Sequence, residues 1–250
     1  MTTSTTLTRR LGDAEVFPIG LGEMPLSLKG RPDEDRAIRT IHAALDAGVN
    51  LIDTADAYAY DDTDINHGER LVAKALKGRR DGVIVATKGG HLRDGQAWPI
   101  DGRPQHIRAA CEASLRALET DRIDLYQFHR PDPHVPYAES IGVFRELQDE
   151  GKVRWLGISN ADTDQIEEAL SIADIVSVQN QLSLDFTSPV LCLRADVSKK
   201  LASWINGTHG RRRGGLRGRQ AVRLRGVIYS FQADSDSAHR HACVAIIRSD

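Results

Sequence analysis

The first 180 residues alternate between short apolar runs and longer amphipathic runs, and this alternation limits the fold more than any other feature of the chain. The apolar runs predict strands at 16–21, 51–53, 83–87, 124–129, 155–159 and 175–179. The runs with helical spacing predict helices at 32–48, 67–76, 104–118, 137–150 and 162–170. Strands that are separated by helices form parallel sheets, because a parallel connection must cross back over the sheet. The sequence therefore predicts an α/β protein with about six βα units.

Two folds with a parallel sheet fit this alternation, a doubly wound sheet and a (β/α)8 TIM barrel. The dinucleotide-binding fingerprint Gly-x-Gly-x-x-Gly does not follow the first strand, which counts against the doubly wound fold. Polar residues end the second to sixth predicted strands, as expected where every strand opens into one mouth. We therefore expect a (β/α)8 TIM barrel that is incomplete.

The charge of the chain changes sign near residue 190. Residues 1–190 hold 21 basic and 31 acidic residues, whereas 191–250 hold 12 basic and 4 acidic ones with no Glu. We expect a barrel domain at 1–190 and an atypical basic tail at 191–250, in which 226–231 and 242–247 have strand composition but no amphipathic helix beside them. The Arg- and Gly-rich run 211–219 is typical either of a frameshifted, disordered segment or of a nucleic-acid-binding tail. Because aromatic residues are not interleaved with the arginines, we expect no nucleic-acid partner.

Other features of the composition concern the compartment and metals. No apolar run approaches the roughly 18 residues that a membrane helix needs, and the N-terminus lacks the pattern of a secretory signal. The cysteines Cys111, Cys192 and Cys243 lie far apart, which indicates reduced thiols in the cytoplasm. The histidines show no metal-ligand spacing, so we expect neither a membrane nor a metal partner.

Four chemically distinctive residues lie at the ends of three successive predicted strands. Asp53 ends the second strand and Tyr58 follows it, while Lys88 and His129 end the next two. A positive charge beside a phenol favours its ionised form, and a carboxylate would hold the lysine in place. Each residue alone has an ordinary structural interpretation, as a cap, a packed ring or a solvated strand end. Together they predict a proton-transfer site at the mouth of the barrel.

Several short motifs resemble the aldo-keto reductases in order and spacing over roughly residues 7–190. In chain order they are Ile19-Gly20-Leu21-Gly22 with Met24, Asp53-Thr54-Ala55 with Tyr58, His67-Gly68-Glu69, Ala86-Thr87-Lys88, Gln127-Phe128-His129-Arg130-Pro131-Asp132, Gly157-Ile158-Ser159-Asn160 and Val178-Gln179-Asn180.

The resemblance implies an oxidoreductase that reduces aldehydes or ketones to alcohols with NADPH. It implies a catalytic tetrad of Asp53, Tyr58, Lys88 and His129, acting on a small carbonyl or alcohol substrate. It further implies cofactor binding by Gly22, Met24, Ser159, Asn160 and Gln179. For Ser159 and Asn160 the residues alone leave open a role in capping the next helix. Trp98, in the loop after the third strand, is a candidate wall of the substrate pocket.

The chain also departs from the family pattern. No phosphate-binding segment is recognisable after residue 190, and Glu23 lies where the family usually has a small or hydroxylated residue. The alternative is therefore a truncated, non-catalytic barrel remnant, or a subunit that binds a nucleotide or a protein partner. Six strands alone would leave two exposed sheet edges, so we expect aggregation unless residues 191–250 or a partner close the barrel. The sequence leaves the oligomeric state open.

Overall fold

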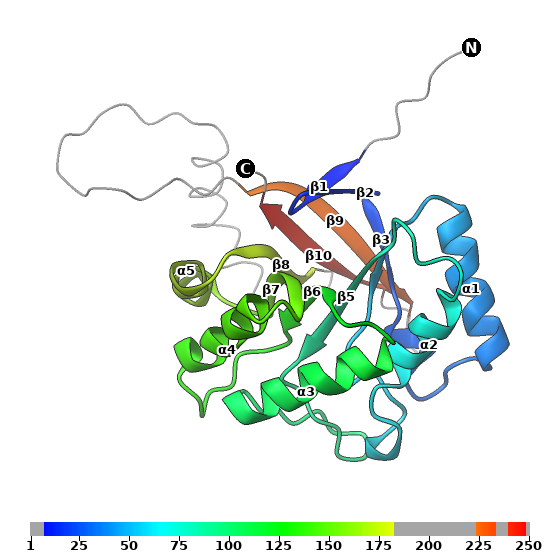
Figure 1. Ribbon diagram of the computed structural model, residues 1–250. Coiled ribbons are helices and arrows are strands. Elements are labelled where there is room, and N and C mark those ends of the chain that lie inside the picture. The colour runs from blue at the N-terminus through cyan, green and yellow to red at the C-terminus, as the bar shows by residue number, and fades with distance from the viewer. Residues whose placement is uncertain (1–7, 183–223, 234–239, 249–250) are drawn as a thin grey trace, which may run out of the picture.

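A computed structural model describes residues 8–182, 224–233 and 240–248, and in them eight strands close into a barrel (Figure 1). Neighbouring strands follow the order β10-β8-β7-β6-β5-β4-β3-β9. Strands β3 to β8 are parallel to one another, as the βα alternation predicts. Their bounds are Ile19–Gly22, Leu51–Asp53, Ile84–Gly89, Ile123–Phe128, Val153–Ser159 and Ile175–Leu182.

In the described residues five α-helices follow one another in the chain, and they lie around the outside of the barrel (Figure 1). They are α1 (Glu34–Asp46), α2 (His67–Ala75), α3 (Pro104–Ala117), α4 (Tyr137–Asp149) and α5 (Thr163–Ile172). All five predicted helices are thus confirmed to within a few residues. The first begins where the Asp33 carboxylate accepts a hydrogen bond from the backbone of Arg36, and the last begins at a capping box of Asp162 and Gln165. Among the described residues, no helix combines the length and the apolar character that crossing a membrane requires.

The amino end of the barrel is plugged by a short antiparallel hairpin, β1 (Arg9–Leu11) and β2 (Ala14–Val16). Its two buried side chains, Leu11 and Val16, join an apolar cluster inside the barrel. The cluster also contains Leu51, Ile84, Ala86, Leu125, Trp155 and Val176. The turn of the hairpin needs Gly12, which has a φ of 57° and lies so close to Trp155 that a Cβ would be 2.4 Å from its Nε1.

The strand predicted at 16–21 is wrong in one respect, because the structure divides it in two. Val16 ends β2, and β3 begins only at Ile19. Between them Pro18 has no N–H to donate to a strand ladder, and the N–H of Phe17 donates to the side chain of Asn50 at 2.7 Å. The chain therefore leaves the plug at Pro18 and enters the barrel as a separate strand.

The barrel closes through two strands in the basic tail, β9 (Leu224–Ala233) and β10 (Arg240–Arg248). Strand β9 pairs in parallel with β3, and β10 pairs antiparallel with both β9 and β8. Strands β9 and β10 thus occupy the place of the last two βα units, on the side of the barrel away from α3 and α4 (Figure 1). The fold is an incomplete (β/α)8 barrel whose two sheet edges are paired with the tail instead of exposed. The basic run 211–219 lies outside the described residues.

Candidate active site

The four residues predicted to transfer protons come together at the carboxyl end of the barrel. Asp53 is the last residue of β4, Lys88 lies near the end of β5, and His129 directly follows β6. Tyr58 lies in the loop after β4. All four are buried, with exposed fractions between 1% for Lys88 and 8% for His129. Parallel strands that end at one mouth bring these residues together, although up to 76 positions separate them in the chain.

An ion pair between Lys88 and Asp53 forms the centre of the site. Lys88 Nζ donates to both carboxylate oxygens of Asp53, at 2.9 and 2.8 Å, and to the carbonyl oxygen of Thr54 at 2.8 Å. It also donates to the Tyr58 hydroxyl at 3.3 Å. Gln179 Nε2 donates to Asp53 Oδ1 at 3.0 Å, so the carboxylate is fixed from two sides. Such geometry is what a buried ion pair needs to offset the loss of hydration.

The imidazole of His129 stands edge-on to the Tyr58 ring, with the ring centres 5.8 Å apart. Its backbone N–H donates to the carbonyl oxygen of Gly89 at 2.9 Å, which ties the residue to the end of β5. Burial lowers the pKa of His129 well below its usual value, and the nearby positive charge of Lys88 lowers it further. The ring is therefore neutral at neutral pH, with one nitrogen that can donate a hydrogen bond.

Trp98 lies beside Tyr58, in the loop that follows β5. The ring centres of the two are 6.2 Å apart, and that of His91 is 6.0 Å from Trp98. The Arg93 guanidinium stacks on Trp98 at 4.1 Å and donates to the backbone oxygen of Tyr60 at 2.9 Å. These contacts hold Trp98 where a wall of a substrate pocket next to the Tyr58 hydroxyl would lie.

Three residues with amide or hydroxyl side chains lie together at the carboxyl end of β7: Ser159, Asn160 and, paired with Ser159 in the neighbouring strand β8, Gln179. Asn160 Nδ2 donates to the carbonyl oxygen of His129 at 3.0 Å and to Ser159 Oγ at 3.1 Å. The N–H of Asn160 donates to the carbonyl oxygen of Gln179 at 3.0 Å. Neither Ser159 nor Asn160 caps α5, because Asp162 does so. Their combined donors and acceptors suit a carboxamide, which itself donates and accepts.

The other two predicted cofactor residues line the same mouth. Gly22 ends β3 and is paired in register with Asp53, and Met24 follows at the start of the 3₁₀ turn η1 (Met24–Leu26). In the family pattern a phosphate-binding segment would come after β8. In this chain that part of the sequence, 183–223, lies outside the described residues. The described residues thus include all five predicted cofactor-binding residues but not the segment 183–223.

The sequence analysis did not predict that three carboxyl groups behind this site are buried. Glu23, Asp56 and Glu69 have exposed fractions of 5% or less. Burial raises the pKa of all three, that of Glu23 to about 8. Glu69 accepts hydrogen bonds from Thr87 and Asn66, both at 2.6 Å. The only sequence signal was Glu23 itself, an acidic residue in an otherwise apolar, Gly-containing loop.

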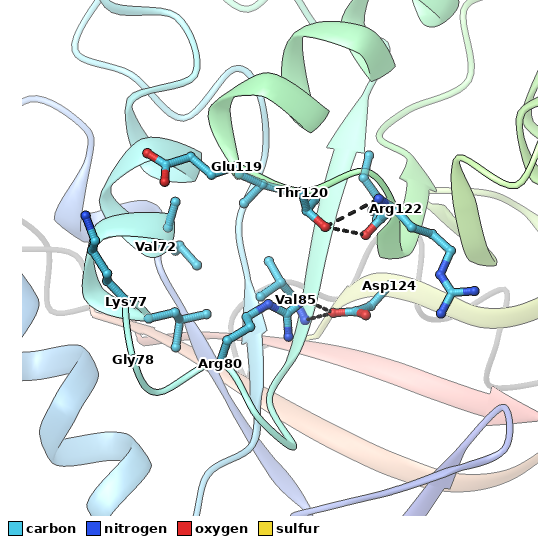
Figure 2. Close-up of a pocket in the computed structure, with 13 residues that line it drawn as sticks. Val72, Lys77, Gly78, Arg80, Val85, Glu119, Thr120, Arg122 and Asp124 are labelled. Carbon is cyan, nitrogen blue, oxygen red and sulfur yellow. Dashed lines mark hydrogen bonds and ion pairs between the residues drawn. The ribbon is translucent and has the colours of Figure 1, made fainter.

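A cavity of about 220 Å³ lies at the opposite end of the barrel (Figure 2). It opens between the carboxyl ends of α2 and α3 and is lined in part by Val72, Val85 and Thr120. Across it, Arg80 is paired with Asp124 at 2.5 Å. Because it borders the amino ends of β5 and β6, it is separate from the candidate site. Within the described residues, no cluster of three His, Cys, Asp or Glu side chains is suited to a metal ion.

Comparison with known proteins gives a consistent picture. The model of the aldo/keto reductase family matches residues 18–201. Aldo-keto reductase YhdN of Bacillus subtilis (strain 168) is 40% identical over 175 residues, a match that covers 68% of this chain and 51% of that protein. The chain spans about half the length of the curated relatives it matches.

Solved structures agree with this match. Aldo-keto reductase AKR11C1 from Bacillus halodurans, in its holo form, superposes with a TM-score of 0.65 at 34% identity, over 86% of this chain and 72% of that one. An aldo/keto reductase from Klebsiella pneumoniae in complex with NADP and acetate superposes with a TM-score of 0.54 at 30% identity, over 68% of this chain and 54% of that one.

Proposed function

The chain belongs to the aldo/keto reductase family, and on that premise we propose that it reduces aldehydes or ketones to alcohols with NADPH. The observation that carries the proposal is the contact of one buried ammonium, Lys88, with both the Asp53 carboxylate and the Tyr58 hydroxyl. The neutral ring of His129 stands edge-on to the same phenol, with the ring centres 5.8 Å apart. This combination supports delivery of a proton to a developing alkoxide.

In the proposed reaction Tyr58 is the proton donor. Bound NADPH supplies the hydride that reduces the carbonyl carbon. The carbonyl oxygen then takes the proton from the Tyr58 hydroxyl, so that one hydride and one proton give the alcohol. Lys88 stabilises the phenolate that is left, because an opposite charge within about 4 Å favours the ionised form. Asp53 positions Lys88, and His129 donates a hydrogen bond to the carbonyl oxygen.

The nicotinamide would be held at the ends of β7 and β8. Ser159, Asn160 and Gln179 are the side chains that would bind its carboxamide, and Gly22 and Met24 would lie along the first loop. The NADP in the complex of the Klebsiella pneumoniae relative supports this choice of cofactor. We further propose a cytoplasmic location, in keeping with the buried free thiol of Cys111, whose pKa burial raises to about 12.

A second function has a specific observation in its favour. The chain covers 51% of its Bacillus subtilis relative, and β9 and β10 stand where two βα units complete the usual barrel. A barrel without the phosphate-binding units would bind NADPH weakly or not at all. The protein would then be a non-catalytic remnant, or a subunit that binds a nucleotide or a protein partner.

NADPH binding separates the two functions. We expect micromolar affinity in a fluorescence titration of the whole chain, followed by turnover of small aldehydes that is lost in Tyr58→Phe. The Tyr58→Phe variant should still bind NADPH, because its hydroxyl is proposed to act on the substrate. Absence of binding up to millimolar NADPH would rule out the reductase and leave the remnant.

A further inference from the structure

Glu23 is the most unusual side chain outside the proposed tetrad. It lies between β3 and η1 with an exposed fraction of 0%. Its two oxygens accept hydrogen bonds from hydroxyl groups, Oε1 from Ser27 and Oε2 from Thr54 at 2.9 Å. Burial favours the protonated form of this carboxyl group and outweighs the two hydroxyl donors, which favour the carboxylate.

The fold leaves a dedicated space for this carboxyl group. Gly68 lies in the first turn of α2, and a Cβ there would come within 2.3 Å of Glu23 Oε2 and 2.7 Å of Thr54 Oγ1. Gly68 has ordinary helical backbone, so the glycine is required by the carboxyl group and not by the turn. In this chain Gly68 therefore makes room for Glu23 and Thr54.

Glu23 is joined to the candidate site through the end of β4. Its N–H donates to the carbonyl oxygen of Asp53 at 2.8 Å. Thr54, whose hydroxyl donates to Glu23, offers its own carbonyl oxygen to Lys88 Nζ at 2.8 Å. Lys88 and Asp53 are the charged groups that act on Glu23, the first lowering its pKa and the second raising it, but burial dominates and raises the pKa to about 8. The same interactions act in reverse, so the charge on Glu23 acts on the Asp53–Lys88 pair.

A short hydrogen-bonded path leads from Glu23 towards the surface. Ser27 Oγ lies 2.8 Å from His67 Nδ1, and His67 is only half-buried. A hydroxyl can donate and accept, so Ser27 can pass a proton between the two groups. Burial, followed by the charge of Arg31, lowers the pKa of His67, which keeps the ring neutral at neutral pH. The other charged groups around it are Asp64, Arg70 and Glu34.

Resting on the proposed function, we propose that Glu23 is a charge-switching positioning residue behind the Asp53–Lys88 pair. Its proton leaves through Ser27 to His67 Nδ1 while His67 Nε2 gives a proton to water, so Ser27 and His67 end neutral and the negative charge stays on Glu23. When Glu23 is neutral, Lys88 acts on Tyr58 with its full charge. When Glu23 is ionised, the extra negative charge opposes loss of the phenol proton, and Tyr58 stays protonated to higher pH.

The first test follows the Glu23 carboxyl directly, without any need for activity. In protein with isotope-labelled glutamate carboxyl carbons, one NMR resonance should titrate with a midpoint near pH 8 and be absent from Glu23→Gln. In Ser27→Ala the midpoint should move to higher pH, because the Ser27 hydrogen bond favours the carboxylate. A midpoint below about pH 6, nearer the ordinary range for a carboxyl group, would overturn the proposal.

The second test measures the coupling to Tyr58. Tyrosinate absorbance is followed against pH, with Tyr58→Phe in each background identifying the Tyr58 transition. We expect Tyr58 to ionise at a lower pH in Glu23→Gln than in the unchanged chain, by about one pH unit. If Glu23→Gln does not fold, Glu23→Thr, which is also uncharged, is measured in its place. An unchanged Tyr58 transition would overturn the proposal. Neither test measures turnover. Both therefore test the proposed role of Glu23 even in a chain that does not reduce carbonyls.

Discussion

The two ends of the barrel are built from the same strands but from opposite kinds of side chain. At the amino end, Leu51, Ile84 and Trp155 pack with the hairpin plug in a wholly apolar cluster. At the carboxyl end, two or more residues further along the same strands, Asp53 and Lys88 are just as buried but charged. Apolar burial stabilises a fold, whereas buried charges cost free energy unless they are paired. The comparison indicates that the amino end stabilises the barrel, whereas the carboxyl end holds buried charges that apolar packing elsewhere must offset.

The largest effect should come from a single oxygen at the carboxyl end. We expect Tyr58→Phe to lower kcat/KM for aldehyde reduction by about 10³-fold, since a positioned general acid contributes roughly 10²–10⁴-fold. Its melting temperature should stay close to that of the unchanged chain. Tyr60→Phe is the matched control, because the Tyr60 side chain is 41% exposed and should keep full activity. Equal losses in the two variants would contradict the proposed role of Tyr58.

At the amino end we expect a substitution to lower the stability of the fold. Trp155→Ala removes a large ring that packs against the plug, which should lower the free energy of unfolding by about 3–5 kcal/mol. Trp98→Ala removes a ring of the same size from a half-buried position near the mouth, and should cost clearly less. Urea unfolding of both variants checks this. A larger loss for Trp98 would show that the amino end is not the main source of stability.

The buried carboxyl of Glu23 should make stability depend on pH. Its pKa is raised from 4.5 to about 8 in the folded chain, so the folded state holds this proton over a range where the unfolded state has lost it. The unchanged chain should therefore lose stability relative to Glu23→Gln as pH rises from about 4.5 to about 8, by at most about 1.4 kcal/mol per pH unit. Urea unfolding of both chains across this window measures the difference. A constant difference would mean that Glu23 has an ordinary pKa.

The smallest effect should come from the outer helices, which belong to neither end. Arg108 on α3 contacts Glu146 and Glu150, with side chains 38% or more exposed. Solvent-exposed ion pairs of this kind contribute less than about 1 kcal/mol. Arg108→Ala should therefore leave both stability and activity nearly unchanged in the same assays. If Arg108→Ala lowered the free energy of unfolding as much as Trp155→Ala does, the outer helices would matter as much for stability as the amino end.

The parallel part of the barrel was predictable from sequence because each βα unit shows its own local signals. Strand 51–53, the helix predicted at 32–48 and the run ending in His129 needed only apolar spacing and helix signals. The tetrad positions followed from motif order, and the structure brings those four side chains together. What these side chains do remains a prediction.

The missed elements depend on contacts that local patterns do not show. Strands β1 and β2 have three residues each and turn inward only Leu11 and Val16, too few to give a period. The burial of Glu23 requires the missing side chain of Gly68, which is 45 positions away in the chain. Nothing in the local sequence of β3 or of β9 indicates that these two strands pair.

The hairpin that closes the barrel also has a consequence for the order of folding. Strands β9 and β10 are neighbours in the chain and can pair early, and each βα unit can form from nearby residues. Ile19, however, is the partner of Tyr229, so the final seam joins positions about 200 residues apart. Closing so long a loop gains no contacts until both edges meet. During synthesis this edge of β3 has no partner strand until residue 231 has been made, and an unpaired strand edge is a site where another chain can pair.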